Sequence, residues 1–301
     1  MSPFVIPVTR IDVSIVIPAY NEARRLPMTL DGWRAFLGQQ AYASEVIVVD
    51  DGSSDFTFQA AADGGARAIR LEPNQGKGAA VRAGVLAADG RVIAYADADM
   101  NVAPSNLARA LEYLDAAAPE AEPRGRNAGE PGPAAAGEPG RAAPREPGRS
   151  AAREPGRSAA GEPGLAAAGK SGRADLVIGR RNLAEYAAAE GPLRLAAGGL
   201  VQVTRRALVL RGIQDTQCGF KVFRRDLARS VFARTRLRSF AFDIEVLFVA
   251  RKLGARIVEM PVATTYRAES TFNVRKHLPR FLRDIVQIRL NDLAGQYDAR
   301  E

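Results

Sequence analysis

The first 100 residues contain four short segments that are rich in apolar residues and do not alternate strictly with polar ones. They are residues 13–17, 46–49, 68–71 and 92–96. Helix-like stretches follow the first two segments, at about 22–39 and 57–64. Strands of this kind are typical of a parallel sheet that is buried on both faces. The order strand, helix, strand therefore predicts an α/β domain with a mostly parallel central sheet.

A cluster of polar and small residues follows each of the four predicted strands. The clusters are Pro18-Ala19-Tyr20-Asn21-Glu22, residues 50–55, residues 74–78 and Asp97-Ala98-Asp99. Open parallel sheets bind ligands at the carboxyl ends of their strands. Because all four clusters stand at such ends, we expect them to meet at one ligand site.

The triplet Asp97-Ala98-Asp99 carries the most direct chemical information. Two carboxylates two residues apart repel each other unless a cation neutralises them, and their hard oxygen atoms favour Mg²⁺ or Mn²⁺. The same triplet is also common in solvated turns and helix caps. A metal-dependent transferase that handles a diphosphate is the first hypothesis, and the sequence that precedes the triplet favours it.

Five segments in this order resemble the motifs of inverting glycosyltransferases of family 2. They are residues 17–22, 49–54, 74–78, 97–99 and 215–221. Within that family the chain is most similar to the polyprenyl- or dolichyl-phosphate hexosyltransferases, in particular their glucosyl branch, over residues 11–118 and 174 to about 270. The resemblance implies a single Rossmann-like nucleotide-diphospho-sugar transferase domain of the GT-A type.

The stretch between these two halves has a different composition. Within residues 119–173, Glu-Pro-Gly recurs every eight residues from Glu130 onward. With proline and glycine in every repeat and few large apolar side chains, this insertion is predicted to be a disordered loop. It is either a flexible tether or partner-binding arm, or a repeat expansion in a tolerated surface loop. The predicted divisions are a nucleotide-sugar-binding half (11–118), this insertion (119–173), an acceptor-binding half (174–270) and a C-terminal helix (271–301).

The residues expected to bind the nucleotide-sugar donor come from the four clusters. An aromatic face stacks on a base and a carboxylate accepts hydrogen bonds from ribose, which suits Tyr20 and Asp51. Gly76 and Gly78 let the backbone approach a diphosphate, and Lys77 between them offsets its charge. With what the resemblance implies, the expected donor-binding residues are Pro18, Ala19, Tyr20, Glu22, Asp50, Asp51, Lys77, Asp97 and Ala98. Purely structural roles also remain open, Pro18 as the end of a strand and Asp51-Gly52 as a turn.

Two aspartates are assigned to the metal. Asp99 is the first choice for direct contact with Mg²⁺ or Mn²⁺, and Asp97 is expected to support the ribose or the water shell of the metal. The cation would act as a Lewis acid that stabilises the leaving nucleoside diphosphate, rather than generate a hydroxide nucleophile.

The scarcity of histidine bears on the acceptor, because His277 is the only one. A sugar hydroxyl needs a general base, whereas a phosphate monoester is already ionised near neutral pH. A lipid phosphate acceptor needs cationic guides instead. The expected guides are Arg180, Arg181, Arg205 and Lys221. Asp243 and Glu245 either border the acceptor side or cap and neutralise this basic cluster.

Charge and apolar content bear on partners and location. The net charge is +8, and residues 174–264 hold 16 basic and 8 acidic side chains, which suits an anionic membrane surface or a phosphate-bearing acceptor as well as a merely solvated basic face. No nucleic-acid-binding motif is present, so nucleic acid is not expected as a partner. Residues 277–293 form a basic amphipathic pattern, typical of a helix in a membrane interface or of one packed on its own domain.

The sequence shows neither an apolar run long enough to span a membrane nor a signal peptide, and its only cysteine, Cys218, excludes an intramolecular disulfide framework. We therefore expect a cytoplasmic protein that is peripheral on the cytoplasmic face of a membrane. The expected activity is inverting transfer of a hexose, glucose from UDP-glucose, to a polyprenyl or dolichyl phosphate. The alternatives are a GDP-mannose donor, a saccharide acceptor, and a catalytically silent nucleotide-sugar-binding scaffold.

Overall fold

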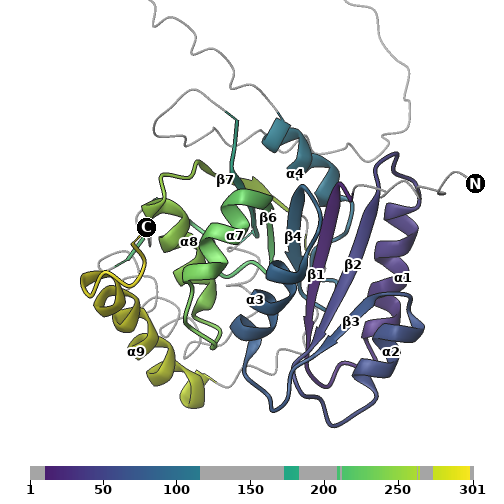
Figure 1. Cartoon of the computed structure of the whole chain (residues 1–301), viewed down its shortest axis with the longest axis horizontal. Helices are drawn as coiled ribbons and strands as arrows, with labels where there is room; N and C mark the ends of the chain where they lie inside the picture. Colours follow the sequence, from purple (N-terminus) through teal and green to yellow (C-terminus); the bar gives the residue numbers. More distant parts are fainter. Residues whose placement is uncertain are drawn as a thin grey trace, which may run out of the picture. The chain divides into compact units, whose positions relative to one another are not determined.

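The computed structural model describes residues 11–115, 173–182, 209–210, 212–262, 264 and 274–298, with side chains from residue 278 onward in the last range. Figure 1 draws the remainder as a thin grey trace. Three predictions lie outside the described part: the disordered insertion up to residue 172, the role of Arg205 and the side chain of His277.

The centre of the described structure is a seven-stranded sheet of order β3-β2-β1-β4-β6-β5-β7. Its strands are β1 (Val13–Ala19), β2 (Ser44–Asp50), β3 (Arg67–Arg70), β4 (Val92–Ala96), β5 (Leu176–Arg180), β6 (Phe220–Arg224) and β7 (Ile257–Pro261). Strand β6 runs antiparallel to β4 and β5, and the other neighbouring strands pair in parallel. The predicted α/β class with a mostly parallel sheet is confirmed.

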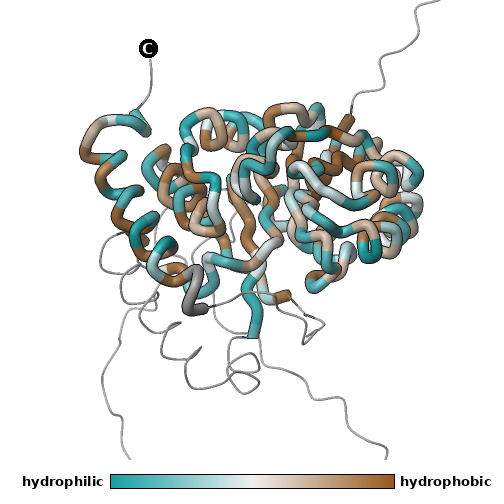
Figure 2. The backbone as a smooth tube through the Cα atoms, turned by 90° about the horizontal axis from the view of Figure 1, so that it is seen from below, coloured by the Kyte–Doolittle hydropathy of each residue, from teal (hydrophilic) through white to brown (hydrophobic). Residues whose placement is uncertain are grey.

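Helices cover both faces of this sheet (Figure 1). They are α1 (Leu26–Leu37), α2 (Thr57–Asp63), α3 (Lys77–Ala87), α4 (Asn106–Asp115), α7 (Arg225–Arg234), α8 (Phe242–Lys252) and α9 (Val274–Leu293). One core cluster joins the sheet to α3, α7, α8 and α9, and a second joins it to α1, α2 and α4. Apolar strand segments accordingly lie between amphipathic helices (Figure 2). The continuous apolar strands of the sequence reflect this burial on two sides.

Strand β1 is longer than the sequence predicts. Pro18 and Ala19 belong to the strand, where both are buried, rather than to the loop that follows it. The pairing of β1 with β4 ends at Val16 and Tyr95, so Pro18 pairs only with Val49 of β2. Proline lacks the N–H group that a second neighbouring strand would need, and at this position there is no second neighbour. The strand therefore continues through Pro18.

Arg224, at the end of β6, holds together the two ends of the chain that flank residues 116–172. Its guanidinium donates from Nε to the carbonyl of Ala174 (3.1 Å) and from a terminal nitrogen to the carbonyl of Leu114. The amide of Ala174 also lies 3.4 Å from the carbonyl of Tyr113. Since β5 runs parallel to β7 and opposite to β6, this junction lies at the amino edge of the sheet, opposite the four polar clusters.

Candidate active site

The segment after β4 meets the segment before β6 at the carboxyl edge of the sheet. Ala96 pairs with Phe220 in the antiparallel ladder, which puts Asp97 beside Gly219. A Cβ atom on Gly219 would overlap the carboxylate of Asp97. The glycine therefore provides the space in which this carboxylate lies, and the Gly-Phe-Lys segment of the second half completes the wall around the acidic pair.

Lys77 is the ion-pair partner of Asp97, with Nζ 2.6 Å from Oδ1. The lysine is the first residue of α3 and follows Gly76, whose φ of 99° favours glycine. Burial alone would lower the pKa of Lys77 and raise that of Asp97, but their mutual attraction shifts both pKa values in the opposite directions. Both groups are therefore charged at neutral pH. The ammonium of Lys77, which we predicted to offset the charge of a diphosphate, is paired with Asp97 in this structure.

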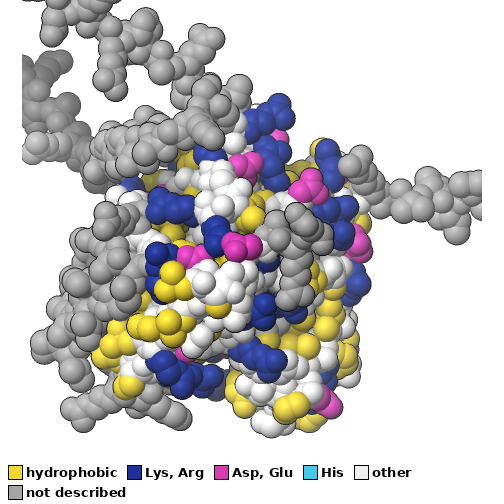
Figure 3. Space-filling model, turned by 60° about the vertical axis from the view of Figure 1, so that its left-hand side comes forward, with side chains coloured by type: hydrophobic (Ala, Val, Ile, Leu, Met, Phe, Trp, Pro, Cys, Tyr) yellow, Lys and Arg dark blue, Asp and Glu magenta, His cyan; other side chains and the backbone are white. Residues whose placement is uncertain are grey.

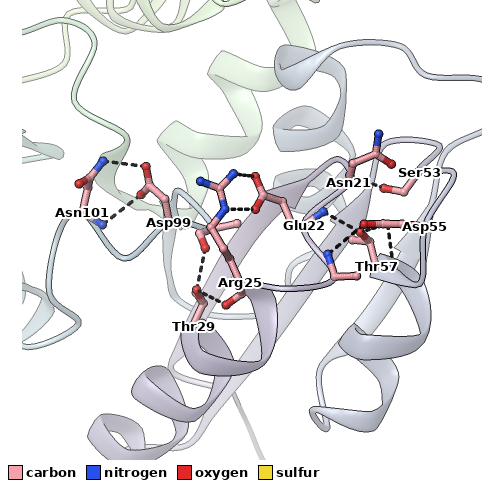
Figure 4. A network of polar contacts seen from close by, with 11 residues as sticks. Asn21, Glu22, Arg25, Thr29, Ser53, Asp55, Thr57, Asp99 and Asn101 are labelled. Atoms are coloured by element: carbon pink, nitrogen blue, oxygen red, sulfur yellow. Dashed lines mark hydrogen bonds and ion pairs between the residues drawn. The ribbon is translucent and has the colours of Figure 1, made fainter. Parts of the chain in front are cut away.

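Asp99 is held by its neighbour Asn101. Its Oδ1 accepts from the Asn101 backbone amide (3.0 Å) and its Oδ2 from the side-chain amide (2.7 Å), as Figure 4 shows. The backbone between Asp97 and Asp99 is also held by helix α1: the hydroxyl of Thr29 donates to the carbonyl of Ala98 (2.6 Å). Burial, and after it the negative charge of Asp97, raises the pKa of Asp99. A cation at this carboxylate would relieve both effects.

This donor set fits a divalent cation that takes its other ligands from a substrate. Within the described ranges, no group of three or more His, Cys, Asp or Glu side chains is arranged to hold a metal. Mg²⁺ is usually held in proteins by one or two carboxylates, with phosphate oxygens and water completing its octahedron. Asp99, with Asp97 next to it, supplies that number of carboxylates.

The loops after β1 and β2 are joined by hydrogen bonds (Figure 4). The amide of Glu22 donates to the hydroxyl of Thr57 (2.8 Å), and the amide of Asn21 to that of Ser53 (2.9 Å). The Glu22 carboxylate accepts two bonds from the Arg25 guanidinium, at 2.6 and 2.7 Å. These contacts hold the segment that carries Tyr20, whose side chain is half exposed and so remains accessible to a base.

Asp50 and Asp51 are buried and bind the backbone of their surroundings. Oδ1 of Asp50 accepts from the amide of Ser53 (3.1 Å). The two oxygens of Asp51 accept from the amides of Gln75 (2.8 Å) and Gly76 (2.7 Å). Asp51 thereby stabilises the turn that immediately precedes Lys77. Its predicted contact with ribose stays a prediction.

The glycines on either side of Lys77 also have a packing role. A Cβ atom on Gly76 would overlap the carbonyl of Arg238, and one on Gly78 would crowd the carbonyl of Leu237. The amide of Gly78 donates to the Arg238 carbonyl (3.0 Å). The glycines therefore let residues 235–240, which we call the α8 loop, lie directly against the start of α3.

Glu245, on α8, holds the α8 loop in place. Its carboxylate accepts from the amides of Arg236 (3.0 Å) and Leu237 (2.8 Å) and from the hydroxyl of Tyr297 (2.6 Å). Burial raises its pKa. Of the two roles left open for Glu245, these contacts favour the structural one, although its partners are backbone amides and a phenol rather than the basic cluster.

Lys221 and Asp243 form a buried ion pair. Burial of the ammonium counts against the predicted role of Lys221 as an acceptor guide, and of the two roles left open for Asp243 the pairing favours neutralisation of a basic side chain. Lys221 is fully buried, and its ammonium donates to the carbonyl of Cys218 (2.8 Å) and to the carboxylate of Asp243. The hydroxyl of Tyr95 donates to the same carboxylate oxygen (2.6 Å). Tyr95 and Lys221 are paired in the β4–β6 ladder and so share one face of the sheet. This face is covered by α7 and α8, which explains why the charge of Lys221 is internal.

Arg180 is the last residue of β5, and Arg181 follows it. Arg181 binds Asp215 through two bonds, Nε to Oδ2 (2.7 Å) and a terminal nitrogen to Oδ1 (2.9 Å). Burial opposes ionisation of Asp215, but this pairing lowers its pKa. Arg180, which is partly buried, donates to the side-chain oxygen of Gln214 (3.2 Å). After Lys77 and Lys221, the positive charge of Arg181 also helps to lower the pKa of Asp97.

Four further residues shape the site without a local signal in the sequence that points to them: Thr29, Tyr95, Asn101 and Gly219. Gly219 lies within a segment already noted for its resemblance, but nothing local indicates that its missing side chain makes room for Asp97. Tyr95 stands in an apolar run, and its polar partner is 148 residues away.

Comparison with known proteins decides the family. Residues 14–122 match the family described as "Glycosyl transferase family 2". A dolichyl-phosphate beta-glucosyltransferase of Drosophila melanogaster is 30% identical over 271 residues, which are 85% of this chain and 67% of that protein. The chain is a family 2 glycosyltransferase. The glycosyltransferase is also 28% identical over 304 residues to a dolichyl-phosphate beta-glucosyltransferase of Dictyostelium discoideum, with 96% of this chain and 77% of that protein covered.

A solved structure agrees with the fold of the glycosyltransferase. It is the glucosyl-3-phosphoglycerate synthase of Mycobacterium tuberculosis in complex with Mn²⁺, UDP and phosphoglyceric acid. The TM-score is 0.55 at 17% identity, covering 96% of this chain and 80% of that one. At this identity the likeness concerns the fold, which is of the GT-A type. That synthase, in its own structure, holds Mn²⁺ together with UDP.

Proposed function

We propose that this glycosyltransferase transfers glucose from UDP-glucose to dolichyl phosphate or another polyprenyl phosphate, with inversion at the anomeric carbon. The observation that carries the proposal is the arrangement of Asp99 beside the Lys77–Asp97 ion pair at the carboxyl edge of the sheet. The named relatives, which are dolichyl-phosphate beta-glucosyltransferases, support the choice of donor and acceptor.

On the donor side, the half-exposed ring of Tyr20 stacks on the uracil base. Asp99 and Asp97 would hold Mg²⁺ or Mn²⁺. When bound, the cation supplies Lewis-acid stabilisation of the UDP leaving group. Lys77 keeps Asp97 ionised and in place, and its ammonium adds positive charge at the edge where the diphosphate lies. Pro18, Ala19 and Ala98 contribute backbone rather than exposed side chains, because all three are buried.

On the acceptor side, an oxygen of the lipid phosphate attacks the anomeric carbon while the bond from that carbon to the UDP oxygen breaks. Attack from the face opposite UDP inverts the configuration. The phosphate is already ionised, so the step needs no general base. Arg180 and Arg181 guide the phosphate, and Arg205, outside the described residues, is proposed as a third guide.

The proposed acceptor also sets where the enzyme works. A dolichyl or polyprenyl phosphate is anchored in a bilayer, so the enzyme acts at a membrane surface. We propose the cytoplasmic face, with the enzyme bound peripherally. Within the part of the chain that the structure describes, no helix is both long and apolar enough to cross a bilayer.

The test is transfer of radiolabelled sugar from a panel of UDP- and GDP-hexoses to polyprenyl phosphate, with Mg²⁺, Mn²⁺ or EDTA present. The expected result is an organic-extractable glycolipid formed from UDP-glucose, with Mg²⁺ or Mn²⁺ and not with EDTA. Asp99→Ala serves as the control and should lose most of the activity while staying folded. Product formed from GDP-mannose alone would show that the donor is GDP-mannose rather than UDP-glucose. A water-soluble product would show that the acceptor is not a lipid phosphate. No product from any donor would favour a silent scaffold.

A further inference from the structure

Helix α9 is fixed to its domain by one face. Phe281, Ile285 and Ile288 are buried in the core cluster shared with α8. On the same side Asp284 accepts a hydrogen bond from the hydroxyl of Ser239 (2.6 Å). These contacts hold the helix on its own domain, and all of them lie on one face of the helix.

The opposite face of α9 carries a second set of apolar side chains. Val286, Leu290 and Leu293 are 43%, 52% and 74% exposed. Their spacing of four and three residues places them along one stripe of the helix, which we call the outer stripe. Hydrophobic and basic side chains adjoin one another on this side of the molecule (Figure 3). Large apolar side chains grouped on an exposed helix face indicate an interaction surface.

Arginines border the outer stripe on both sides. Arg283 and Arg289 stand three residues before and three residues after Val286, so the helical period places them to either side of it. Their side chains are 76% and 45% exposed, although each also lies near an aspartate of the same helix. An apolar stripe with a basic side chain on each side is typical of a helix that lies in the interface of an anionic bilayer.

The packed face of α9, opposite the outer stripe, is connected to the active site through the α8 loop. Ser239, bound to α9 through Asp284, precedes Phe240, which is 47% exposed. The ammonium of Lys77 lies 5.9 Å from the centre of the Phe240 ring. A bilayer on the outer stripe would therefore be separated from the Lys77–Asp97 ion pair by helix α9 and one short loop.

We propose that the outer stripe of α9 docks the enzyme on an anionic bilayer, with Val286, Leu290 and Leu293 in the interface and the arginines at the headgroups. The proposal rests on the proposed function, since a lipid acceptor is what makes a bilayer the partner. The bordering arginines favour an anionic lipid surface over a second copy of this basic chain, whose positive charge would oppose association.

The test is sedimentation of the full chain with vesicles of phosphatidylcholine alone or with phosphatidylserine added. We expect the wild type to bind the anionic vesicles, and Leu290→Glu to bind about tenfold more weakly because a charge enters the interface. Met28→Glu is the matched control: Met28 is 47% exposed on α1, and this variant should bind like the wild type. Arg283→Glu should weaken binding to the anionic vesicles about fivefold or more.

Two further measurements separate the possible failures. Transfer to a short-chain polyprenyl phosphate in detergent should be equal for the wild type and Leu290→Glu, because the stripe takes no part in the chemistry. Stripe-dependent sedimentation without any transfer would disprove the proposed function and leave the docking surface standing. Equal sedimentation of the wild type and Leu290→Glu, or no binding of the wild type, would overturn the docking proposal. So would a wild-type dimer in light scattering that Leu290→Glu converts to a monomer.

Discussion

Gly219 lies so close to Asp97 that a single added carbon atom on the glycine would overlap the aspartate carboxylate. The two residues are 122 positions apart in the chain and come from the two halves of the domain. Gly219→Ala is therefore expected to turn the Asp97 carboxylate away from Lys77 and to lower kcat/KM by about 10²-fold, the cost of losing one well-placed electrostatic group. The measurement is steady-state transfer, with thermal unfolding as the check that the variant is folded.

A double variant shows whether this loss passes through Asp97. If Gly219 acts by making room for that carboxylate, Asp97→Ala and Asp97→Ala/Gly219→Ala should have equal activity, because the truncated side chain no longer needs the space. Additive losses would mean that Gly219 acts by another route, such as the backbone of β6.

The buried pair of Lys221 and Asp243 is expected to govern stability. Lys221→Met leaves the carboxylate of Asp243 without its ammonium partner in the core, which should lower the free energy of unfolding by about 3–5 kcal/mol. Lys221→Met/Asp243→Leu removes both charges and should recover most of that loss. Urea denaturation measures both variants. A stable Lys221→Met enzyme with only a raised KM for the lipid phosphate would instead restore the role of acceptor guide.

Asn101 is expected to set the affinity for the metal, since it donates to both oxygens of Asp99. Removing the partner that orients a ligating carboxylate usually costs about 10- to 100-fold in metal affinity or activity. Asn101→Ala should therefore raise the Mg²⁺ or Mn²⁺ concentration for half-maximal transfer about tenfold. Asn106→Ala, which removes an asparagine bonded to the carbonyl of Ala103, is the control and should leave the metal dependence unchanged. Equal metal dependence of Asn101→Ala and the wild type would contradict the assignment.

The Arg181–Asp215 pair predicts a pH dependence of stability. The pKa of Asp215 is lowered from its ordinary value of 3.8, so its contribution is complete above that pH and is lost as the pH falls through the native pKa. The free energy of unfolding of the wild type should exceed that of Asp215→Asn at neutral pH, and the difference should shrink below about pH 3.8. Urea titrations of both proteins at several pH values measure it. A constant difference would show that the pairing contributes no charge-dependent stability.

Tyr20 is expected to contribute to donor binding through its ring. Stacking of a base on an aromatic side chain is worth about 1–3 kcal/mol, so Tyr20→Ala should raise the KM for UDP-glucose by roughly 5- to 150-fold. Tyr20→Phe keeps the ring and is the matched control. If Tyr20→Phe is as impaired as Tyr20→Ala, the hydroxyl rather than the ring face binds the donor.

The sheet was predictable because burial on two faces leaves a local trace in the sequence. Continuous apolar runs such as residues 46–49 predict parallel strands, and the polar residues that follow them predict the ligand edge. The predicted end of β1 was wrong by two residues. Proline usually terminates a strand, but Pro18 continues β1 because it has a neighbouring strand on only one side. That circumstance depends on which strands become neighbours, which the local sequence does not specify.

The same limit explains what was missed at the site. Lys221 stands two residues after Gly219 in a segment expected to bind phosphate, and only its pairing opposite Tyr95 shows that it points into the core. This pairing joins strands more than 100 residues apart, and it involves β6, the one strand of the described sheet that runs antiparallel to its neighbours. Asp97 and Asp99 were identified because their chemistry is local: two carboxylates after one strand. The partners that position them come from distant segments.

The junction at Arg224 allows the described fold to tolerate a connection of almost any length between its two halves. The chain departs at Leu114 and resumes at Ala174, and one guanidinium bonds to both carbonyls at the edge of the sheet opposite the reacting groups. Each doubling of a flexible connection costs only about 0.6 kcal/mol in closure entropy. This point is thus a natural place for sequence growth, and a protein engineer has there a ready site for grafting a reporter domain, a purification handle or a second enzyme without touching the catalytic edge.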